Sequence, residues 1–228
     1  MILAYHRVNP WYKKDVLSVS PEQFERQLRY TLKRFHPVSL SALPVIKPDD
    51  FLITFDDGYA DNLWHAIPVL KKLGIVPIIF LTVNYIGTDY IFNRYRDKEK
   101  DRFLTWDEVK KMSGEGVVFG SHSLSHPHLP NLSDSQLWIE IADSKKMIED
   151  KTGKTVDFFC YPYGDFDKRV IEKVQLAGYK SAFVTPPKRK KIKESNYTLL
   201  RTGVYGHNNF LAFRVKIWKN YSLERYKL

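Results

Sequence analysis

Cysteine is almost absent from this chain of 228 residues, in which Cys160 is the only one. A single thiol excludes an internal disulfide and leaves the redox compartment undetermined. The sequence has no run of about 18 apolar residues, so it predicts no membrane-spanning helix. Its first residues, Met1 to Arg7, lack the long apolar segment of a secretory signal. We therefore expect a cytoplasmic protein as the sequence is written, or an extracytoplasmic one if the natural N-terminus was trimmed.

The chain also has no internal repeat, no low-complexity linker and no nucleic-acid-binding module. Its length suits one large domain, and 43% hydrophobic residues is typical of a globular protein with a substantial core. We therefore predict a single domain over residues 1–228.

Positive charge is in excess, with a formal net charge of +10. Much of it lies in the run 188–193, Lys-Arg-Lys-Lys-Ile-Lys, which follows two prolines. Such a run can contact a phosphate or an anionic lipid surface. Most such runs are solvated loops, and no stacking pattern for nucleic acid accompanies this one. We therefore expect no nucleic-acid partner, and we hold an anionic surface contact through 188–193 as the alternative to a solvated loop.

Predicted strands and helices alternate along most of the chain. The apolar runs lie at 2–6, 51–55, 75–83, 117–121, 156–160, 180–184 and 199–205. Helix-like patterns follow Ser20, Thr105, Ser133 and Asn209, and two more lie at 63–73 and 170–177. This alternation indicates an α/β fold with a parallel sheet. No glycine-rich phosphate turn follows the first strand, as would be usual in an open doubly wound sheet. Polar residues gather at successive strand ends instead, which favours a barrel.

Two of these strand ends carry groups suited to catalysis. The run Phe51 to Phe55 leads directly into Asp56, Asp57 and Gly58, and 117–121 leads into His122 and His126. Adjacent buried carboxylates repel each other unless a cation or a proton resolves the conflict. Imidazole and carboxylate together suit zinc or a similar divalent ion. Either pair alone could be structural, but the two together favour a metal site.

Other strand ends add weaker candidates. His6 ends the first strand, and its position resembles those of Asp56 and His122, although a surface turn would explain it equally well. Tyr161, Pro162 and Tyr163 end the strand at 156–160 in a turn set by proline and glycine. The polar and aromatic stretch 84–103 is the longest irregular segment, and we expect a surface insertion near the site.

These motifs resemble those of the polysaccharide deacetylase family, also called the NodB-homology or family 4 carbohydrate esterases. Thr54-Phe55-Asp56-Asp57-Gly58 matches the family's TFDDG motif, and His122-Ser123-Leu124-Ser125-His126 matches its H-[ST]-x-x-H motif. Tyr161-Pro162-Tyr163-Gly164 resembles the third motif, R-x-P-Y. The opening Tyr5-His6-Arg7 looks like the branch that deacetylates poly-β-1,6-N-acetylglucosamine. The resemblance implies a distorted (β/α) barrel, usually of seven strands.

The resemblance also implies a role for each matching residue. Asp57, His122 and His126 would hold a divalent metal ion, most commonly zinc, although Co, Ni or Fe would accept the same ligands. Asp56 would be the general base that activates the attacking water. The backbone N–H of Tyr163 would assist at the oxyanion, with Tyr161 and Pro162 shaping the substrate-binding turn. Acetate and a free amine would be the products.

Two departures from the family pattern concern the catalytic groups. Cys160 stands where the third motif has the arginine that orients the base, and His207 lacks the leucine of the family's Leu-x-His motif. Either another residue orients Asp56, or Asp56 is less well tuned as a base. We predict that His6 protonates the leaving amine. His36, His65 and His128 are interpreted as structural.

The expected function is the removal of N-acetyl groups from an N-acetylglucosamine polymer or oligosaccharide. Two alternatives remain at this point: a deacetylase of a small or lipid-linked N-acetyl sugar, and an inactive carbohydrate-binding relative.

Overall fold

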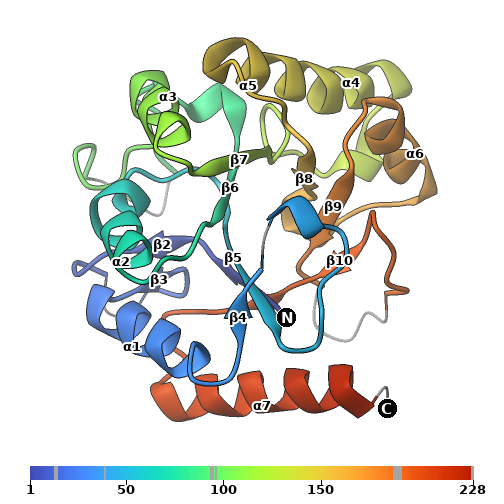
Figure 1. Ribbon diagram of the computed structural model, residues 1–228. Helices are drawn as coiled ribbons and strands as arrows, with labels where there is room; N and C mark the ends of the chain where they lie inside the picture. Colours follow the sequence, from blue (N-terminus) through green and yellow to red (C-terminus); the bar gives the residue numbers. More distant parts are fainter. Residues whose placement is uncertain (13–14, 39, 93–94, 96, 187–191, 227–228) are drawn as a thin grey trace.

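A sheet of parallel strands forms the centre of the molecule and nearly closes into a barrel (Figure 1). The computed structural model describes residues 1–228 except 13–14, 39, 93–94, 96, 187–191 and 227–228. The strand order is β10-β9-β8-β7-β6-β5-β1-β11, with β4 paired to β5 and a separate pair β2-β3. The strands are β1 Ile2–Tyr5, β2 Arg7–Val8, β3 Ser18–Val19, β4 His36–Pro37, β5 Asp50–Phe55, β6 Ile78–Leu81, β7 Val118–Ser121, β8 Phe158–Cys160, β9 Ser181–Val184, β10 Leu199–Leu200 and β11 Thr202–Gly203.

Helices surround this sheet, as Figure 1 shows. The α-helices are α1 Pro21–Thr31, α2 Ile67–Lys72, α3 Trp106–Gly114, α4 Asp134–Trp138, α5 Ser144–Thr152, α6 Lys168–Leu176 and α7 Phe210–Tyr226. Short 3₁₀ or π segments are η1 Leu40–Ala42, η2 Asn62–Ala66, η3 Val83–Tyr85, η4 Leu129–Asn131, η5 Ile139–Asp143 and η6 Pro162–Gly164. None of the described helices is both long and apolar enough to cross a bilayer.

The last strand segment joins the two edges of the sheet. β10 pairs with β9 and β11 pairs with β1, and only Arg201 separates them. The Arg201 N–H donates to Val184 O at 2.9 Å, and the Val204 N–H donates to Ala4 O at 2.8 Å. The described sheet path therefore contains eight strands rather than the expected seven, because the closing segment is divided at Arg201.

Local sequence signals set the helix boundaries as predicted. Thr105 and Ser133 each complete a capping box at the start of α3 and α4. Gly153 ends α5 in the left-handed conformation with φ 66°. Pro68 lies in the first turn of α2, directly after the π turn η2, at a position where a helix tolerates proline.

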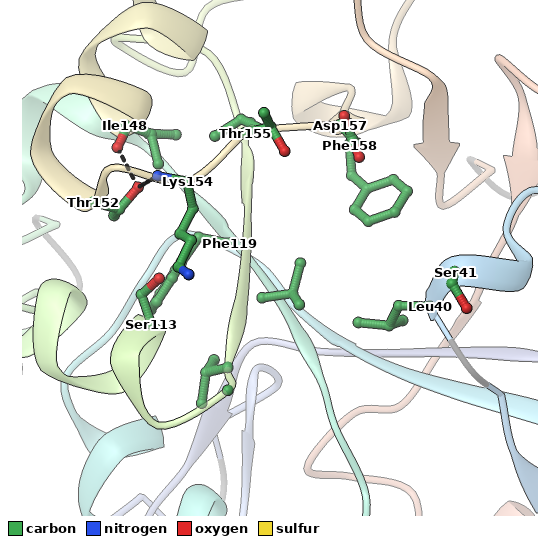
Figure 2. Close-up of a pocket in the computed structure, with 14 residues that line it drawn as sticks. Leu40, Ser41, Ser113, Phe119, Ile148, Thr152, Lys154, Thr155, Asp157 and Phe158 are labelled. Atoms are coloured by element: carbon green, nitrogen blue, oxygen red, sulfur yellow. Dashed lines mark hydrogen bonds between the residues drawn. The ribbon is translucent and has the colours of Figure 1, made fainter.

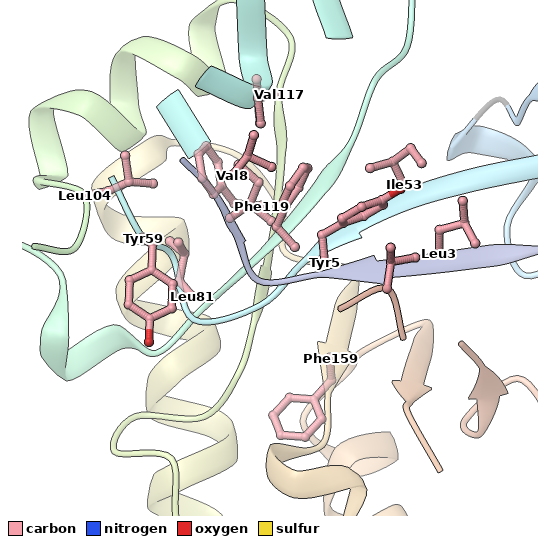
Figure 3. Packing of buried hydrophobic residues seen from close by; sticks show 14 of the residues in the cluster. Leu3, Tyr5, Val8, Ile53, Tyr59, Leu81, Leu104, Val117, Phe119 and Phe159 are labelled. Carbon is pink, nitrogen blue, oxygen red and sulfur yellow. The ribbon is translucent and has the colours of Figure 1, made fainter. Parts of the chain in front are cut away.

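The core has two layers because successive strand residues point to opposite faces. One cluster contains Ile2, Leu52, Phe80, Phe158 and Phe183 and fills the barrel interior. The other lies between the sheet and the helices, and Figure 3 shows its members Leu3, Tyr5, Ile53, Phe119 and Phe159 among others. Continuing the inward alternation past the strand ends brings His6, Asp56 and His122 to the mouth of the interior.

A buried ion network joins the N-terminal segment to the long insertion. Arg7 is fully buried and donates from Nε to Asp61 at 2.6 Å and from Nη1 to Asp101 at 2.8 Å. The rings of Tyr12, Tyr59 and Tyr95 surround its guanidinium at 4.3 to 5.2 Å. The second half of the insertion is therefore fixed to the barrel.

Candidate active site

Asp57, His122 and His126 converge at the C-terminal ends of β5 and β7. Asp57 Oδ1 lies 3.8 Å from His122 Nε2 and 3.7 Å from His126 Nε2. One donor atom from each of the three residues lies within 4.8 Å of the other two. Zinc binds nitrogen and oxygen ligands at about 2.0–2.2 Å, so ligands of one ion lie about 3 to 4 Å apart. The three predicted ligands therefore fit one small divalent ion.

Unusual backbone conformations hold these ligands. Asp57, Ser123 and His126 have φ of 72°, 66° and 60°, in the left-handed region that non-glycine residues rarely adopt. The His126 N–H donates to Ser123 Oγ at 3.0 Å, which closes the turn between the two histidines. Gly58, with φ 87°, leaves no room for a Cβ, which would lie 2.8 Å from the Leu81 side chain.

The histidines are prepared to act as neutral ligands. His122 Nδ1 lies 2.7 Å from Cys160 O, a contact that places the proton on Nδ1 and leaves the Nε2 lone pair directed toward Asp57. Burial lowers the pKa of His122 to about 3 and also lowers the pKa of His126. Both rings are therefore uncharged near neutral pH, as metal binding requires.

Arg201 holds the second carboxylate of the motif. Its Nη1 and Nη2 donate to Asp56 Oδ1 and Oδ2 at 2.7 Å each, and Nη1 also donates to Thr54 Oγ1 at 3.1 Å. Asp56 is 3% exposed and Arg201 5%. Burial disfavours the carboxylate, but the guanidinium outweighs burial and keeps the pKa of Asp56 below its usual value. The carboxylate is thus both ionised and fixed in orientation.

Cys160 makes the space that Arg201 occupies. Its thiol lies 3.0 Å from Arg201 Nη2 and 3.7 Å from Asp56 Oδ1, inside the barrel end. The sequence showed that an arginine is missing at position 160, and the structure places a guanidinium beside Asp56 from β10–β11 instead. Sequence reasoning missed Arg201, and its only local signal was an arginine directly after the apolar pair Leu199–Leu200.

His6 lies beside Asp56 rather than at the surface. Its Nε2 is 3.8 Å from Asp56 Oδ2, and its side chain is 20% exposed. The Asn62 side chain donates to the His6 carbonyl at 3.0 Å and fixes the backbone at this strand end. A ring that borders the cleft and faces the base is suitably placed for proton transfer.

The three residues of the third motif differ in position. Tyr163 has φ 59° and is 55% exposed, and its ring lies 4.5 Å from that of His126. Tyr161 is 1% exposed and its hydroxyl donates to Tyr197 O at 2.9 Å. Pro162 is buried within the turn. Tyr163 and Tyr161 line the cleft, and direct substrate contact by any of the three stays a prediction.

Of the remaining histidines, His128 packs against the turn that contains Tyr163, and the others lie away from the proposed metal ligands. His128 stacks on Tyr163 at 4.1 Å and lies 3.2 Å from Asp165. His65 packs against Trp11, His207 stacks on Tyr205, and His36 is exposed in β4.

A cleft of about 810 Å³ contains the candidate catalytic groups. Phe92 of the predicted insertion lines one side of this cleft, and its ring lies 6.5 Å from that of His126. Tyr59 lines the same wall and stacks on Phe103 at 4.9 Å. The described part of the 84–103 segment therefore borders the site, as expected. Residues 188–191 of the basic run lie outside the described residues.

A second cavity of about 400 Å³ lies near the starts of β7 and β8, at the opposite end of the strands (Figure 2). Among the described residues that line it, Lys154 and Asp157 carry the only charges. It contains none of the predicted site residues. Of these two cavities of the described structure, the cleft at the C-terminal ends of the strands is therefore the one that brings the candidate catalytic groups together.

The fold and the site together define a (β/α)-barrel protein with a candidate Asp-His-His metal site beside the carboxylate of Asp56, which Arg201 holds. Comparison of the sequence with known protein families identifies the family within this class. The profile of the family described as Polysaccharide deacetylase matches residues 46–182. The chain therefore belongs to the polysaccharide deacetylase family.

Individual relatives agree with this assignment. YxkH of Bacillus subtilis (strain 168), which carries a polysaccharide deacetylase name, is 29% identical over 211 residues, covering 89% of this chain and 70% of YxkH. The peptidoglycan-N-acetylmuramic acid deacetylase PdaA of the same strain is 24% identical over 175 residues, covering 76% of this chain and 59% of PdaA. This chain thus spans about six-tenths of PdaA.

Solved structures show the same fold. BC0361, a polysaccharide deacetylase from Bacillus cereus, superposes with a TM-score of 0.78 at 23% identity, covering 95% of this chain and 68% of that one. IcaB from Ammonifex degensii gives a TM-score of 0.78 at 23% identity, covering 96% of both chains.

Proposed function

We propose that this protein is a metal-dependent N-deacetylase that acts on polysaccharide containing N-acetylglucosamine, with residues 1–228 as one catalytic domain. The observation that carries the proposal is the placement of Asp57, His122 and His126 around one point, with the Arg201-bound Asp56 beside them. A bound divalent ion, with zinc as the first candidate, would supply Lewis-acid activation of water and of the substrate carbonyl.

Asp56 is the general base in this proposal. Its carboxylate takes a proton from water as the water oxygen bonds to the acetamide carbon. The salt bridge to Arg201 fixes both oxygens, so that the carboxylate is presented in one orientation without rearrangement. The backbone N–H of Tyr163 serves as a donor to the carbonyl oxygen as negative charge develops there.

His6 is the proposed general acid. It gives a proton to the amide nitrogen as the C–N bond breaks, which releases acetate and a free amine. His6 Nε2 lies 3.8 Å from Asp56 Oδ2. The proton that Asp56 takes from water can therefore pass to His6 and from His6 to the leaving nitrogen.

The proposed substrate is a β-1,6-linked N-acetylglucosamine polymer. The Tyr5-His6-Arg7 opening supports that branch, and His6 does lie at the site. The relative PdaA is a peptidoglycan-N-acetylmuramic acid deacetylase, so peptidoglycan is the polymer to compare directly with this substrate.

Two variants test the assignment of base and ligand. Asp56→Asn should lower kcat for acetate release by at least about 10²-fold, because an amide cannot accept the proton, while the metal content is retained. His122→Ala should lose the metal, measured by elemental analysis of the purified protein. Full activity in the first variant, or unchanged metal content in the second, contradicts the assignment.

Substrate class follows from acetate release measured on β-1,6 and β-1,4 N-acetylglucosamine oligomers after chelation and metal add-back. Release that returns with metal and rises with oligomer length supports the polysaccharide proposal. Tight metal binding without release from any oligomer indicates a small or lipid-linked N-acetyl sugar. A chain that binds no metal and releases no acetate is a carbohydrate-binding relative.

A further inference from the structure

The outer face of α7 exposes a row of three large apolar side chains. Leu211 is 65% exposed, Val215 45% and Trp218 61%. Their spacing of four and three residues places them on one face of the helix. Phe213 and Ile217 occupy the opposite face and are buried. Helix α7 is therefore apolar on two faces, and the fold covers only one of them.

Figure 1 shows that α7 lies along the outside of the barrel, next to α1. We call the face that carries Leu211, Val215 and Trp218 the α7 stripe. In this position of α7 the stripe is directed away from the sheet. A flat extended surface could contact the whole row without any change in the fold.

Cationic side chains border the α7 stripe on its α1 side. Arg26 lies over the Phe210 ring at 3.9 Å, and Arg214 lies over the Tyr30 ring at 5.5 Å. Arg29 and Lys33 line the same groove between the two helices.

The negative charges in this region are fewer. The groove also contains Glu22 and Glu25, and Glu25 is paired with Arg29 at 2.7 Å. In the part of α7 whose side chains the structure describes, 210–218, Arg214 and Lys216 are basic and no residue is acidic. The whole chain has a formal net charge of +10, so the region is basic in a basic protein.

We propose that the α7 stripe and its basic border bind the surface of an anionic lipid bilayer. A helix with tryptophan and aliphatic residues on one face and Lys or Arg beside them has the composition of helices that lie in the membrane interface. Tryptophan favours the headgroup level, and anionic headgroups attract the neighbouring cations.

A second copy of the chain fits this surface less well. In a two-fold dimer each patch meets its own copy, so Arg29, Lys33 and Arg214 would face like charges. An anionic bilayer complements the same arrangement of apolar and basic groups.

The proposal links the surface to the cleft through one residue. Lys216 of α7 lines the catalytic cleft and donates to Gly203 O at 2.8 Å and to Asn208 Oδ1 at 2.7 Å. Lipid binding itself does not depend on the proposed deacetylase activity.

Flotation of the full chain with vesicles tests the proposal. The vesicles are phosphatidylcholine alone, or phosphatidylcholine with an equal share of phosphatidylglycerol, at salt of about 0.1 M and about 1 M. We expect at least a tenfold higher bound fraction on the anionic vesicles at low salt, and a loss of this difference at high salt.

Leu211→Gln/Val215→Gln/Trp218→Gln should reduce that binding at least tenfold. The matched control replaces three exposed apolar residues elsewhere, Val76→Gln/Ile139→Gln/Leu176→Gln, which are 45%, 48% and 70% exposed. Arg29→Gln/Lys33→Gln should weaken binding, whereas Lys146→Gln/Lys168→Gln on α5 and α6 should not.

Circular dichroism and acetate release from a soluble oligomer should be unchanged in all four variants. Absence of vesicle binding by the unmodified chain, or equal loss in the stripe and control variants, overturns the proposal. A dimer detected by light scattering that the stripe variant converts to monomer, without an effect of vesicles, assigns the stripe to self-association instead.

Discussion

Arg201 places a guanidinium beside Asp56, where the resemblance to the family predicts an arginine from position 160. The guanidinium makes a bidentate contact to Asp56, which only arginine can provide with this planar geometry. It enters from the strand segment beyond β9, whereas the family's third motif would supply it at position 160 on β8. The small Cys160 leaves the volume that this entry requires.

Arg201→Lys should lower kcat for acetate release by about 10²-fold, with a smaller change in KM. One ammonium group cannot hold both carboxylate oxygens, so Asp56 loses its fixed orientation while the charge balance is kept. Metal content should be unchanged, because Arg201 contacts none of the three proposed ligands through the hydrogen bonds described. Steady-state kinetics measures kcat and KM, and elemental analysis measures the metal content.

Cys160→Ala serves as the control for that variant. The thiol lies 3.7 Å from Asp56, too far for a strong hydrogen bond, and burial raises its pKa well above the usual value, so it stays neutral. We expect activity within a few-fold of the unmodified chain. A loss in Cys160→Ala as large as in Arg201→Lys would contradict the assignment of the orienting role to Arg201.

At the scale of the element, the turn after β5 combines two demands. It must place adjacent carboxylates in different directions, and it must pack against the β6 end. The left-handed Asp57 turns its side chain toward the histidines, and Gly58 follows with φ 87° against Leu81 and Ile86. Conformation and close packing both require glycine at position 58.

Gly58→Ala should lower the free energy of unfolding by about 2–3 kcal/mol, because strain from the positive φ adds to a contact of 2.8 Å. For a chain of this length the midpoint should fall by about 4–12 °C in a thermal melt followed by circular dichroism.

Gly74→Ala is the matched control. Gly74 also has a positive φ, 68°, but a Cβ there would meet nothing within 4 Å. We expect a cost of about 1 kcal/mol from the backbone alone. Equal destabilisation by the two variants would show that packing under Gly58 contributes nothing.

At the scale of the whole molecule, the Arg7 network connects segments that are far apart in the sequence. It joins β2, the turn after β5 and the insertion, through the contacts of Arg7 to Asp61 and Asp101. Because Tyr59 and Phe92 line the cleft next to this network, its geometry sets the position of one cleft wall.

Arg7→Met should destabilise the protein by about 3–5 kcal/mol, because it leaves two fully buried carboxylates without their cation. This corresponds to a midpoint lower by about 6–20 °C in a thermal melt. Arg29→Met, which removes an exposed arginine paired with Glu25, should cost less than about 1 kcal/mol. Similar losses in the two variants would contradict the role of the buried network.

The sequence predicted the features that local patterns determine. Asp57 and His126 lie in short motifs at strand ends, and parallel strands bring such ends together, so the proximity of these side chains could be predicted from order and spacing. Arg201 could not be predicted in the same way, since it lies 145 residues from Asp56 and its contact depends on how the sheet closes. The count of strands was wrong by one for the same reason.

The segment 199–204 has a consequence for how the enzyme comes into being. It is the last part of the barrel to be synthesised, it joins both edges of the sheet, and it carries the arginine that orients Asp56. A nascent chain would present Asp57, His122 and His126 well before this segment leaves the ribosome, but its Asp56 would still lack the contact with Arg201. If Asp56 is the general base, as proposed, a chain whose barrel has not closed lacks the contact that orients this base.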